Sequence, residues 1–253
     1  MFEYNLLMDE NARVSQIYFH ELSKSNYPPK KVVLFRKLDL KPIIPIMTME
    51  EHYEILNNIL PEAHDSLLNL KDLDKINDEN IISVTSKNIN DNIVAEVIKE
   101  TISGNTLIAA TGIMKENILS LPKIDFLNVH SGYLPYSRGL DNFFYALIYN
   151  EVPGFSVHFV DRGVDTGDII FRKKINIDLK NKGLENYDKK KVFITIKYFL
   201  VPYLKAQVFR EFIECVNSKA LEITKIKQDI KKGRTFYKIH NSLKEIVMDK
   251  ITM

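Results

Sequence analysis

The chain is 253 residues long, 45% hydrophobic and 27% charged, and its 35 basic and 33 acidic residues give a net charge of +2 at pH 7. This composition is typical of a globular protein and excludes a disordered chain or a general polyanion binder. A single cysteine, Cys215, excludes an intramolecular disulfide framework and fits a reducing cytosol. We find no apolar run of about 18 residues and no signal peptide, so neither a membrane span nor export is expected.

The first third of the chain alternates short apolar runs with helical periodicity. We predict strands over residues 4–8 and 32–35, and helices over residues 12–24, 49–59 and 61–70. Asn11 is the expected cap of the first helix. Residues 72–80 form a charged connector.

A regular alternation begins at residue 81. It predicts strands over residues 81–85, 107–110 and 126–129, and helices over residues 92–101 and 114–121, with Gly104 as the C-cap of the first helix. Such a β-α-β-α-β run with short connections predicts a parallel sheet with helices on both faces and right-handed crossovers.

The second half continues the pattern and then becomes helical. We predict a helix over residues 141–150, strands over residues 155–160 and 168–177, and one or two helices over residues 184–216, broken near Pro202. The fold class is therefore α/β and Rossmann-like. Residues 1–180 are expected to form the catalytic domain, and residues 181–253 a small helical C-terminal extension packed on it.

The tail from residue 219 to residue 250 holds nine Lys and Arg against four Asp and Glu, and a last helix is predicted over residues 237–248. We interpret the tail as a solvated amphipathic end. The alternative is that Lys231, Lys232 and Arg234 help to hold an anionic ligand.

Polar side chains cluster where two predicted strands end. Asn128 and His130 lie two apart on a strand and therefore share a face, and Asp165 follows the next strand. Chemistry collects at such strand ends in α/β proteins, so we expect these three side chains to meet. His158, inside an alternating strand, is expected to make a structural hydrogen bond. Dinucleotide, P-loop and nucleophile-elbow glycine motifs are absent, and no histidine pair has metal-ligand spacing, so no metal site is expected.

An ordered set of motifs lies within this stretch: Asn128-Val129-His130, Leu134-Pro135, Arg138-Gly139, Val157-His158 and Asp165-Thr166-Gly167. From about residue 107 to residue 177 the chain resembles the folate-dependent formyltransferases, most closely the sugar N-formyltransferases. Two departures are Ser131, where the family usually has proline, and Asp168, where it often does. Neither position carries a reacting group, so they concern loop detail.

The resemblance implies transfer of a formyl group from the co-substrate N10-formyltetrahydrofolate to a primary amine. Asn128 would donate hydrogen bonds to the developing oxyanion. His130, favoured in its protonated form, would stabilise the oxyanion and take part in proton transfer, and Asp165 would orient it and accept the proton. Residues implied to hold the folate are Thr111, Gly112, Ile113, Met114, Asp161 and Val164, and those implied to contact the amine acceptor are Tyr133, Tyr136, Arg138 and Asn142.

The acceptor is narrowed by elimination among the family's classes. The chain lacks the C-terminal β domain of methionyl-tRNA formyltransferases, the phosphate loop of glycinamide ribonucleotide formyltransferases, and a convincing N-terminal regulatory domain of formyltetrahydrofolate hydrolases. A nucleotide-linked amino sugar is therefore the expected acceptor. We expect a cytoplasmic enzyme with a small-molecule partner, no membrane or nucleic-acid partner, and a homodimer left open. A non-catalytic folate-binding or interaction protein is the alternative from another class.

Overall fold

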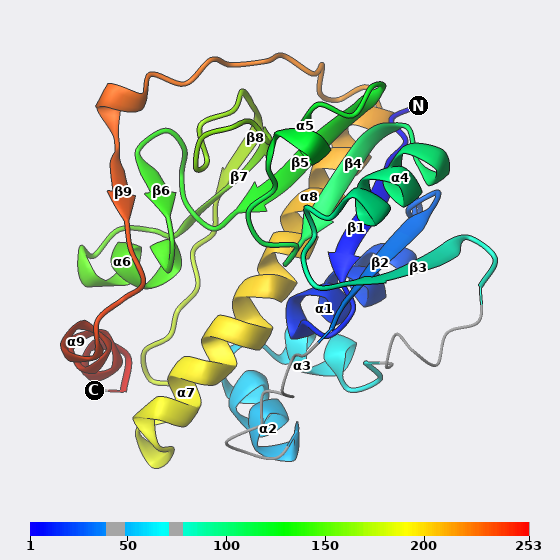
Figure 1. The fold of residues 1–253 in the computed structure, drawn as a ribbon. Helices are drawn as coiled ribbons and strands as arrows, with labels where there is room; N and C mark the ends of the chain where they lie inside the picture. Colours follow the sequence, from blue (N-terminus) through cyan, green and yellow to red (C-terminus); the bar gives the residue numbers. More distant parts are fainter. Residues whose placement is uncertain (39–48, 71–77, 253) are drawn as a thin grey trace.

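The computed structural model describes residues 1–38, 49–70 and 78–252. A seven-stranded sheet has the order β3-β2-β1-β4-β5-β7-β8 (Figure 1). Its strands are β1 (Asn5–Asp9), β2 (Val32–Lys37), β3 (Ile81–Ser86), β4 (Gly104–Ala109), β5 (Ile124–His130), β7 (Gly154–Phe159) and β8 (Ile169–Lys174). Neighbours from β3 to β5 are parallel, and β7 and β8 add to the β5 edge antiparallel. The predicted Rossmann-like, mostly parallel sheet is confirmed.

Helices cover both faces of the sheet. Helices α1 (Arg13–Ser23) and α8 (Val201–Asn217) lie on one face, and α4 (Asn92–Thr101) and α5 (Glu116–Leu119) lie on the other (Figure 1). Strand β1 shows the reason: Leu6 and Met8 join the α1–α8 core, whereas Leu7 joins the core beneath α4. A strand with apolar side chains on both faces of the sheet must be covered on both faces.

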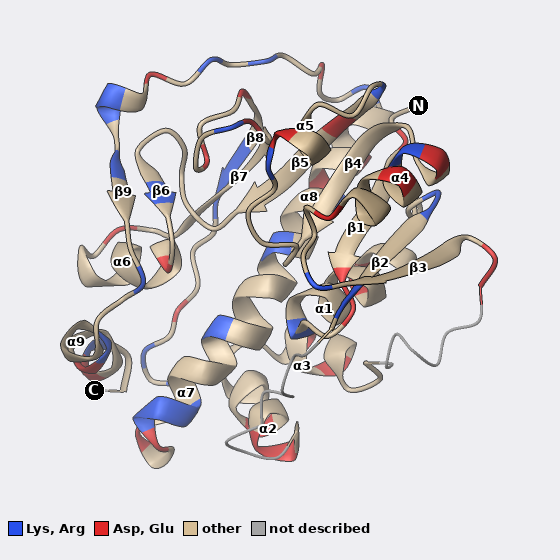
Figure 2. Ribbon diagram, in the orientation of Figure 1, with Lys and Arg blue, Asp and Glu red and all other residues tan. Residues whose placement is uncertain are grey.

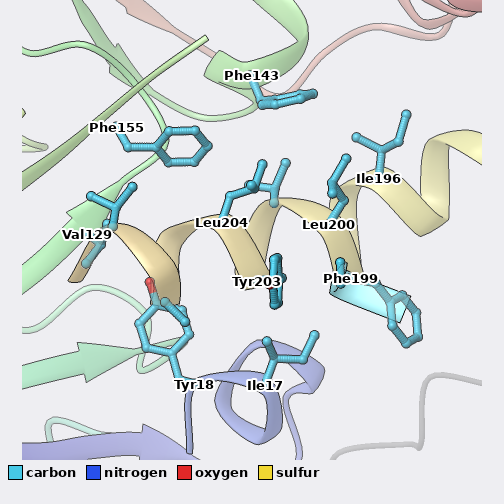
Figure 3. Close-up of a cluster of buried hydrophobic side chains, with 14 of the residues drawn as sticks. Ile17, Tyr18, Val129, Phe143, Phe155, Ile196, Phe199, Leu200, Tyr203 and Leu204 are labelled. Carbon is cyan, nitrogen blue, oxygen red and sulfur yellow. The ribbon is translucent and has the colours of Figure 1, made fainter. Parts of the chain in front are cut away.

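The longest helix packs against the sheet near the end of β5. Helix α7 (Lys189–Thr195) continues through a π-helical segment (Ile196–Leu200) into α8. Pro202, at the start of α8, lacks an N–H and would crowd a preceding carbonyl, and the wider π turn accommodates it. The predicted interruption near Pro202 is therefore confirmed. Figure 3 shows Leu200 and Leu204 directed toward Phe143 and Phe155, and Tyr203 toward Ile17 of α1.

The run Lys189–Asn217 is long and apolar enough, at mean hydropathy 1.3, to cross a membrane, and 72% of its most apolar window is buried within the fold. The sequence prediction missed this window. Core helices of soluble proteins meet the same criteria of length and composition. The helix is therefore weak support for a membrane span.

The C-terminal part of the chain forms an unpredicted small sheet. Strand β9 (Arg234–Phe236) pairs in parallel with β6 (Ser137–Gly139), nearly a hundred residues earlier in the chain. The remaining elements are α2 (Met49–Ile59), α3 (Pro61–Leu67), α6 (Asn142–Ile148), η2 (Leu184–Asn186), η4 (Ile230–Lys232) and α9 (Asn241–Thr252). The last predicted helix exists, but it begins at Asn241, because residues 237–240 are not helical.

Two predicted helix caps are wrong. Ala12 is the N-cap of α1 and makes no side-chain hydrogen bond, whereas the backbone N–H of Asn11 donates to Asp9 Oδ1 over 2.9 Å. Helix α4 ends at the extended residue Ile102, and Gly104, with φ of +80°, begins β4. Most of the predicted connector over residues 72–80 lies outside the described residues. The domain boundary at residue 180 stays a prediction.

Candidate active site

The antiparallel pairing of β5 with β7 builds the centre of the site. Its register sets Asn128 opposite His158 and His130 opposite Ser156. His158 Nδ1 lies 2.8 Å from the carbonyl oxygen of Phe159, to which it can only donate. The neutral ring then keeps a lone pair on Nε2. This nitrogen lies 3.3 Å from Asn128 Nδ2 and can accept a hydrogen bond from it. The expected structural hydrogen bond of His158 is present, and its other nitrogen faces the site.

Asp165 enters from the loop between β7 and β8. Its backbone adopts the left-handed conformation, with φ of +54°. One carboxylate oxygen, Oδ2, accepts a 2.9 Å hydrogen bond from the backbone N–H of Gly139 and lies 3.4 Å from His130 Nδ1. The other oxygen lies 3.6 Å from His158 Nε2. The structure thus brings Asn128, His130 and Asp165 together as expected, with His158 as a fourth member.

The ring of His130 is fixed from its other side. Its Nε2 lies 2.9 Å from the carbonyl oxygen of Ser137, an acceptor, and 3.2 Å from the amide nitrogen of Asn142, a donor. We assign the proton to Nε2 on the shorter of these contacts, which leaves the lone pair on Nδ1. Gly132 permits this packing, because a Cβ there would lie 2.5 Å from His130 Nε2 and 2.2 Å from the Ser137 carbonyl oxygen. The ring is therefore held with Nδ1 toward Asp165.

Burial determines the charge of His130, which is only 5% exposed. It lowers the pKa of His130 to about 4, and this outweighs the opposite effect of Asp165, while His158 and Lys205 lower it further. The expectation of a protonated imidazole is therefore wrong for the free protein, in which the ring is neutral at pH 7. Burial also lowers the pKa of His158.

Lys205 is a charged neighbour that the sequence analysis missed. It lies on α8, half-buried, with its ammonium 5.8 Å from the centre of the Tyr18 ring. Burial lowers its pKa to about 8, and the Asp165 carboxylate opposes this. The available signal was its position between Leu204 and Ala206, both buried, in a strongly apolar helix.

The residues expected to hold the folate lie on two segments near this centre. Residues 111–114 follow β4, where Asn90 Nδ2 donates to the carbonyl oxygen of Ile113 over 3.0 Å. On the second segment, Asp161 Oδ1 accepts from the N–H of Gly163 and from Thr166 Oγ1. Thr111 and Met114 are each 7% exposed, whereas Ile113 is 79% and Val164 56% exposed.

A surface hollow of about 400 Å³ lies between α5 and the start of the loop that carries Asp161. Its lining is Glu116, Leu119, Val160, Asp161 and Arg162. Nothing lies within 4 Å of a Cβ built on Gly112, so space is also open there. Ile113 and Val164 are exposed apolar side chains on the two segments, whereas three of the five residues that line the hollow are charged. A second hollow, of about 580 Å³ beside α9, contains none of the expected site residues.

The residues expected to contact the acceptor divide into two pairs. Tyr133 and Tyr136 stack at 6.4 Å between ring centres, and Tyr136 is 53% exposed. Arg138 is buried and donates to the carbonyl oxygens of Pro135 and Ile230. The Asn142 amide nitrogen donates to the carbonyl oxygen of Gly139 over 2.8 Å and lies 3.2 Å from His130 Nε2. Arg138 and Asn142 therefore face protein groups here.

Charged residues also follow the tail. Figure 2 shows Lys and Arg on β9 and at the turn before it, which corresponds to Lys231, Lys232 and Arg234. All three are exposed. Their proposed role toward an anionic ligand stays a prediction. Within the described residues, no group of three or more His, Cys, Asp or Glu side chains could hold a metal ion.

Comparison with known proteins places this geometry in a family. The sequence pattern of the formyl transferase family, described as "Formyl transferase", matches residues 21–193. This match covers more than half of the chain, which therefore belongs to the formyl transferase family.

Sequence relatives match only part of their own length. The methionyl-tRNA formyltransferase of Finegoldia magna is 34% identical over 108 residues, 42% of this chain and 35% of that protein. The methionyl-tRNA formyltransferase of Clostridioides difficile is 29% identical over 148 residues, 56% of this chain and 48% of that one. The matched part of this chain thus spans between a third and a half of the length of these relatives.

Solved structures share the fold along more of the chain. A 4-N formyltransferase from Francisella tularensis has a TM-score of 0.51 at 14% identity, over 97% of this chain and 86% of that one. The N-formyltransferase of Helicobacter canadensis, in complex with folinic acid and dTDP-3-aminofucose, has a TM-score of 0.50 at 15% identity, over 100% and 80%. Glycinamide ribonucleotide transformylase 1 from Symbiobacterium toebii has a TM-score of 0.51 at 17% identity, over 90% and 93%. At such identities the likeness shows the fold.

Proposed function

We propose that this protein transfers the formyl group of N10-formyltetrahydrofolate to a primary amine. The observation that carries the proposal is the arrangement of Asn128, His130 and Asp165 at the end of β5, in a chain of the formyl transferase family. Residues 111–114 and the loop with Asp161 and Val164 are the proposed folate-binding segments. The hollow of about 400 Å³ that Asp161 lines together with α5 supports the second of them.

The proton chemistry follows from the tautomer of His130. The attacking amine must lose a proton as its bond to the formyl carbon forms. Nδ1 of neutral His130 offers a lone pair, and the carboxylate of Asp165, 3.4 Å away, would stabilise the imidazolium that results. The same proton is then available to the folate nitrogen when its bond to the formyl carbon breaks. His130 thus acts first as base and then as acid.

Asn128 would bind the formyl oxygen as it gains negative charge. Its Nδ2 is a hydrogen-bond donor, and the acceptor that it contacts here is His158 Nε2. The distance between the two atoms, 3.3 Å, indicates a weak hydrogen bond. A preformed donor of this kind typically contributes a factor on the order of 100 to 1,000 in rate. His158, through its bond to the Phe159 carbonyl, would keep the amide of Asn128 oriented.

For the acceptor, we propose the amino group of a nucleotide-linked amino sugar. The fold match to the Helicobacter canadensis protein, which binds dTDP-3-aminofucose, extends over 100% of this chain and supports this choice. The stacked pair Tyr133 and Tyr136 is the proposed acceptor contact, since the exposed ring of Tyr136 suits a sugar or a base. Arg172 and Lys174 lie over the ring of Tyr133. Contact with Arg138 or Asn142 would require release of their present partners.

A second candidate acceptor is methionyl-tRNA, favoured by the 34% identity to the Finegoldia magna methionyl-tRNA formyltransferase. The near-neutral net charge of +2 and the partial coverage of that relative weigh against it.

The test is an acceptor screen. The purified chain is mixed with N10-formyltetrahydrofolate and either dTDP-3-aminofucose, other nucleotide amino sugars, methionyl-tRNA or buffer alone, and release of tetrahydrofolate is followed. Turnover that requires an amino sugar supports the proposal. Turnover in buffer alone would indicate a hydrolase, and absence of turnover with every acceptor would refute the activity.

A further inference from the structure

The C-terminal segment over residues 226–239, here termed the strap, is fastened across the catalytic loops. It begins with a two-way backbone bridge, 2.9 Å in each direction, between Ile226 and Ile169 of β8. It continues through the pairing of β9 with β6 and a 2.9 Å hydrogen bond from Leu140 to the carbonyl oxygen of Phe236. It ends where the backbone N–H of Ile239 donates to Asp141 Oδ2 over 3.0 Å. The strap therefore contacts both loops that build the site.

Gln228 is the one strap side chain that reaches Asp165. Its Nε2 donates to the carbonyl oxygens of Asp165, over 3.0 Å, and Gly167, over 2.6 Å. Both partners are acceptors, so the amide orientation is fixed. In the stretch 222–232, all of which is described, Gln228 is partly buried and all the remaining residues are exposed. The amide thus clamps the turn 165–167 from outside.

This turn needs a clamp. Asp165 holds a positive φ of +54°, which is unusual for a residue with a side chain. Gly167 lies so close to β7 that a Cβ there would be 1.9 Å from the Phe159 carbonyl oxygen. In this conformation the Asp165 carboxylate lies 3.4 Å from His130 Nδ1 and 3.6 Å from His158 Nε2. The other amide atom of Gln228, Oε1, is buried and has no hydrogen-bond partner among the described residues. The side chain therefore keeps its two donor contacts while its acceptor stays unpaired.

We propose that Gln228 is a positioning residue that holds the Asp165 loop in the geometry required for proton transfer at His130. The inference rests on the proposed function of Asp165. The strap thereby makes the C-terminal tail part of the active site without a contact to the substrate.

The test compares Gln228→Met, which keeps the size and removes the donor, with Gln228→Glu, which sets a carboxylate against two carbonyl oxygens. Gln207→Met is the matched control, because Gln207 lies on α8 and its amide donates to Glu21 over 2.7 Å. Amide hydrogen exchange over residues 164–168 and the pKa of His130, read by NMR, are measured on the full chain. Formyl transfer to dTDP-3-aminofucose is measured alongside.

Both Gln228 variants should raise exchange over residues 164–168 by about tenfold or more and lower kcat by about tenfold, with KM for N10-formyltetrahydrofolate within about twofold. In Gln228→Met, which adds no charge, the pKa of His130 should fall, since Asp165 raises it. The control should match the unmodified chain. Unchanged exchange and an unchanged His130 pKa overturn the proposal, as does faster exchange with unchanged kcat. Should the unmodified chain not transfer formyl groups to this sugar, the proposed acceptor fails, while the exchange and pKa results still decide the role of Gln228.

Discussion

Two proton acceptors face each other at the centre of the site: the free Nδ1 of His130 and Oδ2 of Asp165, 3.4 Å apart. The pair is poised to take up one proton, because an imidazolium at this position would gain the nearby carboxylate. Burial and Lys205 work against early protonation by lowering the pKa of His130 to about 4. In the proposed reaction, the amine rather than solvent would therefore supply this proton.

Replacement of Asp165 by asparagine should separate the chemistry from the fold. Asp165→Asn keeps the side-chain size and removes the charge that stabilises the imidazolium, so we expect kcat to fall by on the order of 100-fold or more. Steady-state kinetics with N10-formyltetrahydrofolate measure this, with thermal unfolding as the control for folding. Loss of less than about threefold in a folded variant would contradict the role given to Asp165.

Lys205 should shift the acid limb of the pH–rate profile, although burial is the largest cause of the low pKa of His130. Its charge lowers the pKa of His130, so Lys205→Met should raise that pKa and move the acid limb of kcat/KM to higher pH. Asp165 and His158 also act on the pKa of His130, and both are unchanged in this variant. Lys173→Met, which removes a surface ion pair with Glu211, is the control. An acid limb that does not move with Lys205 would exclude this electrostatic link.

At the residue scale, the sequence predicted which residues meet in the site better than it predicted the protonation state of His130. The spacing of Asn128 and His130 gave their shared face, because strand side chains alternate. The neutral ring of His130 could not be predicted, since it depends on burial by segments far apart in the sequence. Lys205 and Gln228 were missed because their relation to Asp165 exists only in three dimensions.

At the scale of elements, one close contact of the strap is with Gly139 of β6. A Cβ there would lie 2.0 Å from the Phe236 carbonyl oxygen, and its φ is +88°. Gly139→Ala should therefore cost about 1–2 kcal/mol for the backbone conformation and more for displacing β9. Gly104→Ala is the matched control, because Gly104 has φ of +80° but no atom within 4 Å of its Cβ.

Urea unfolding measures both variants, and we expect Gly139→Ala to be less stable than Gly104→Ala by at least about 1 kcal/mol. Hydrogen exchange should show loss of protection in β9 for Gly139→Ala only. Equal destabilisation of the two variants, with β9 still protected, would show that the strap accommodates the added Cβ without a loss of unfolding free energy.

The elements that were predicted well are those with a strong local pattern. The β-α-β-α-β run from residue 81 has apolar strands and an amphipathic α4, and its strands formed as expected. The β6–β9 pair joins two three-residue segments from distant parts of the chain. Such short strands have no periodicity of their own, so their pairing follows from tertiary contacts.

For the whole molecule, buried neutral histidines should make stability depend on pH. Burial lowers the pKa of His52 to about 4, with Arg13 reinforcing and Glu51 opposing the effect. The unfolded chain takes up this proton near pH 6.5 and the folded chain only near pH 4, so stability falls as the pH drops through this window.

His52→Gln isolates this contribution away from the site. His52 contacts Thr195 Oγ1 at 2.9 Å and packs on Phe199 with ring centres 4.3 Å apart. The loss of unfolding free energy between pH 7.5 and pH 5 should be smaller in the variant by about 2 kcal/mol. Urea titrations at the two pH values measure it, and an equal loss in both proteins would indicate that His52 is protonated when folded.

The central claim is that one formyl group moves directly from N10-formyltetrahydrofolate to an amine, with His130 as the base and acid that carries the proton. The most direct measurement follows a ¹³C-labelled formyl group by mass spectrometry during a single turnover, in the unmodified chain and in His130→Ala. The account predicts one labelled formyl group on the amine for each tetrahydrofolate released, and loss of both products in the variant. Tetrahydrofolate release without label on any amine, or full transfer by His130→Ala, would contradict it.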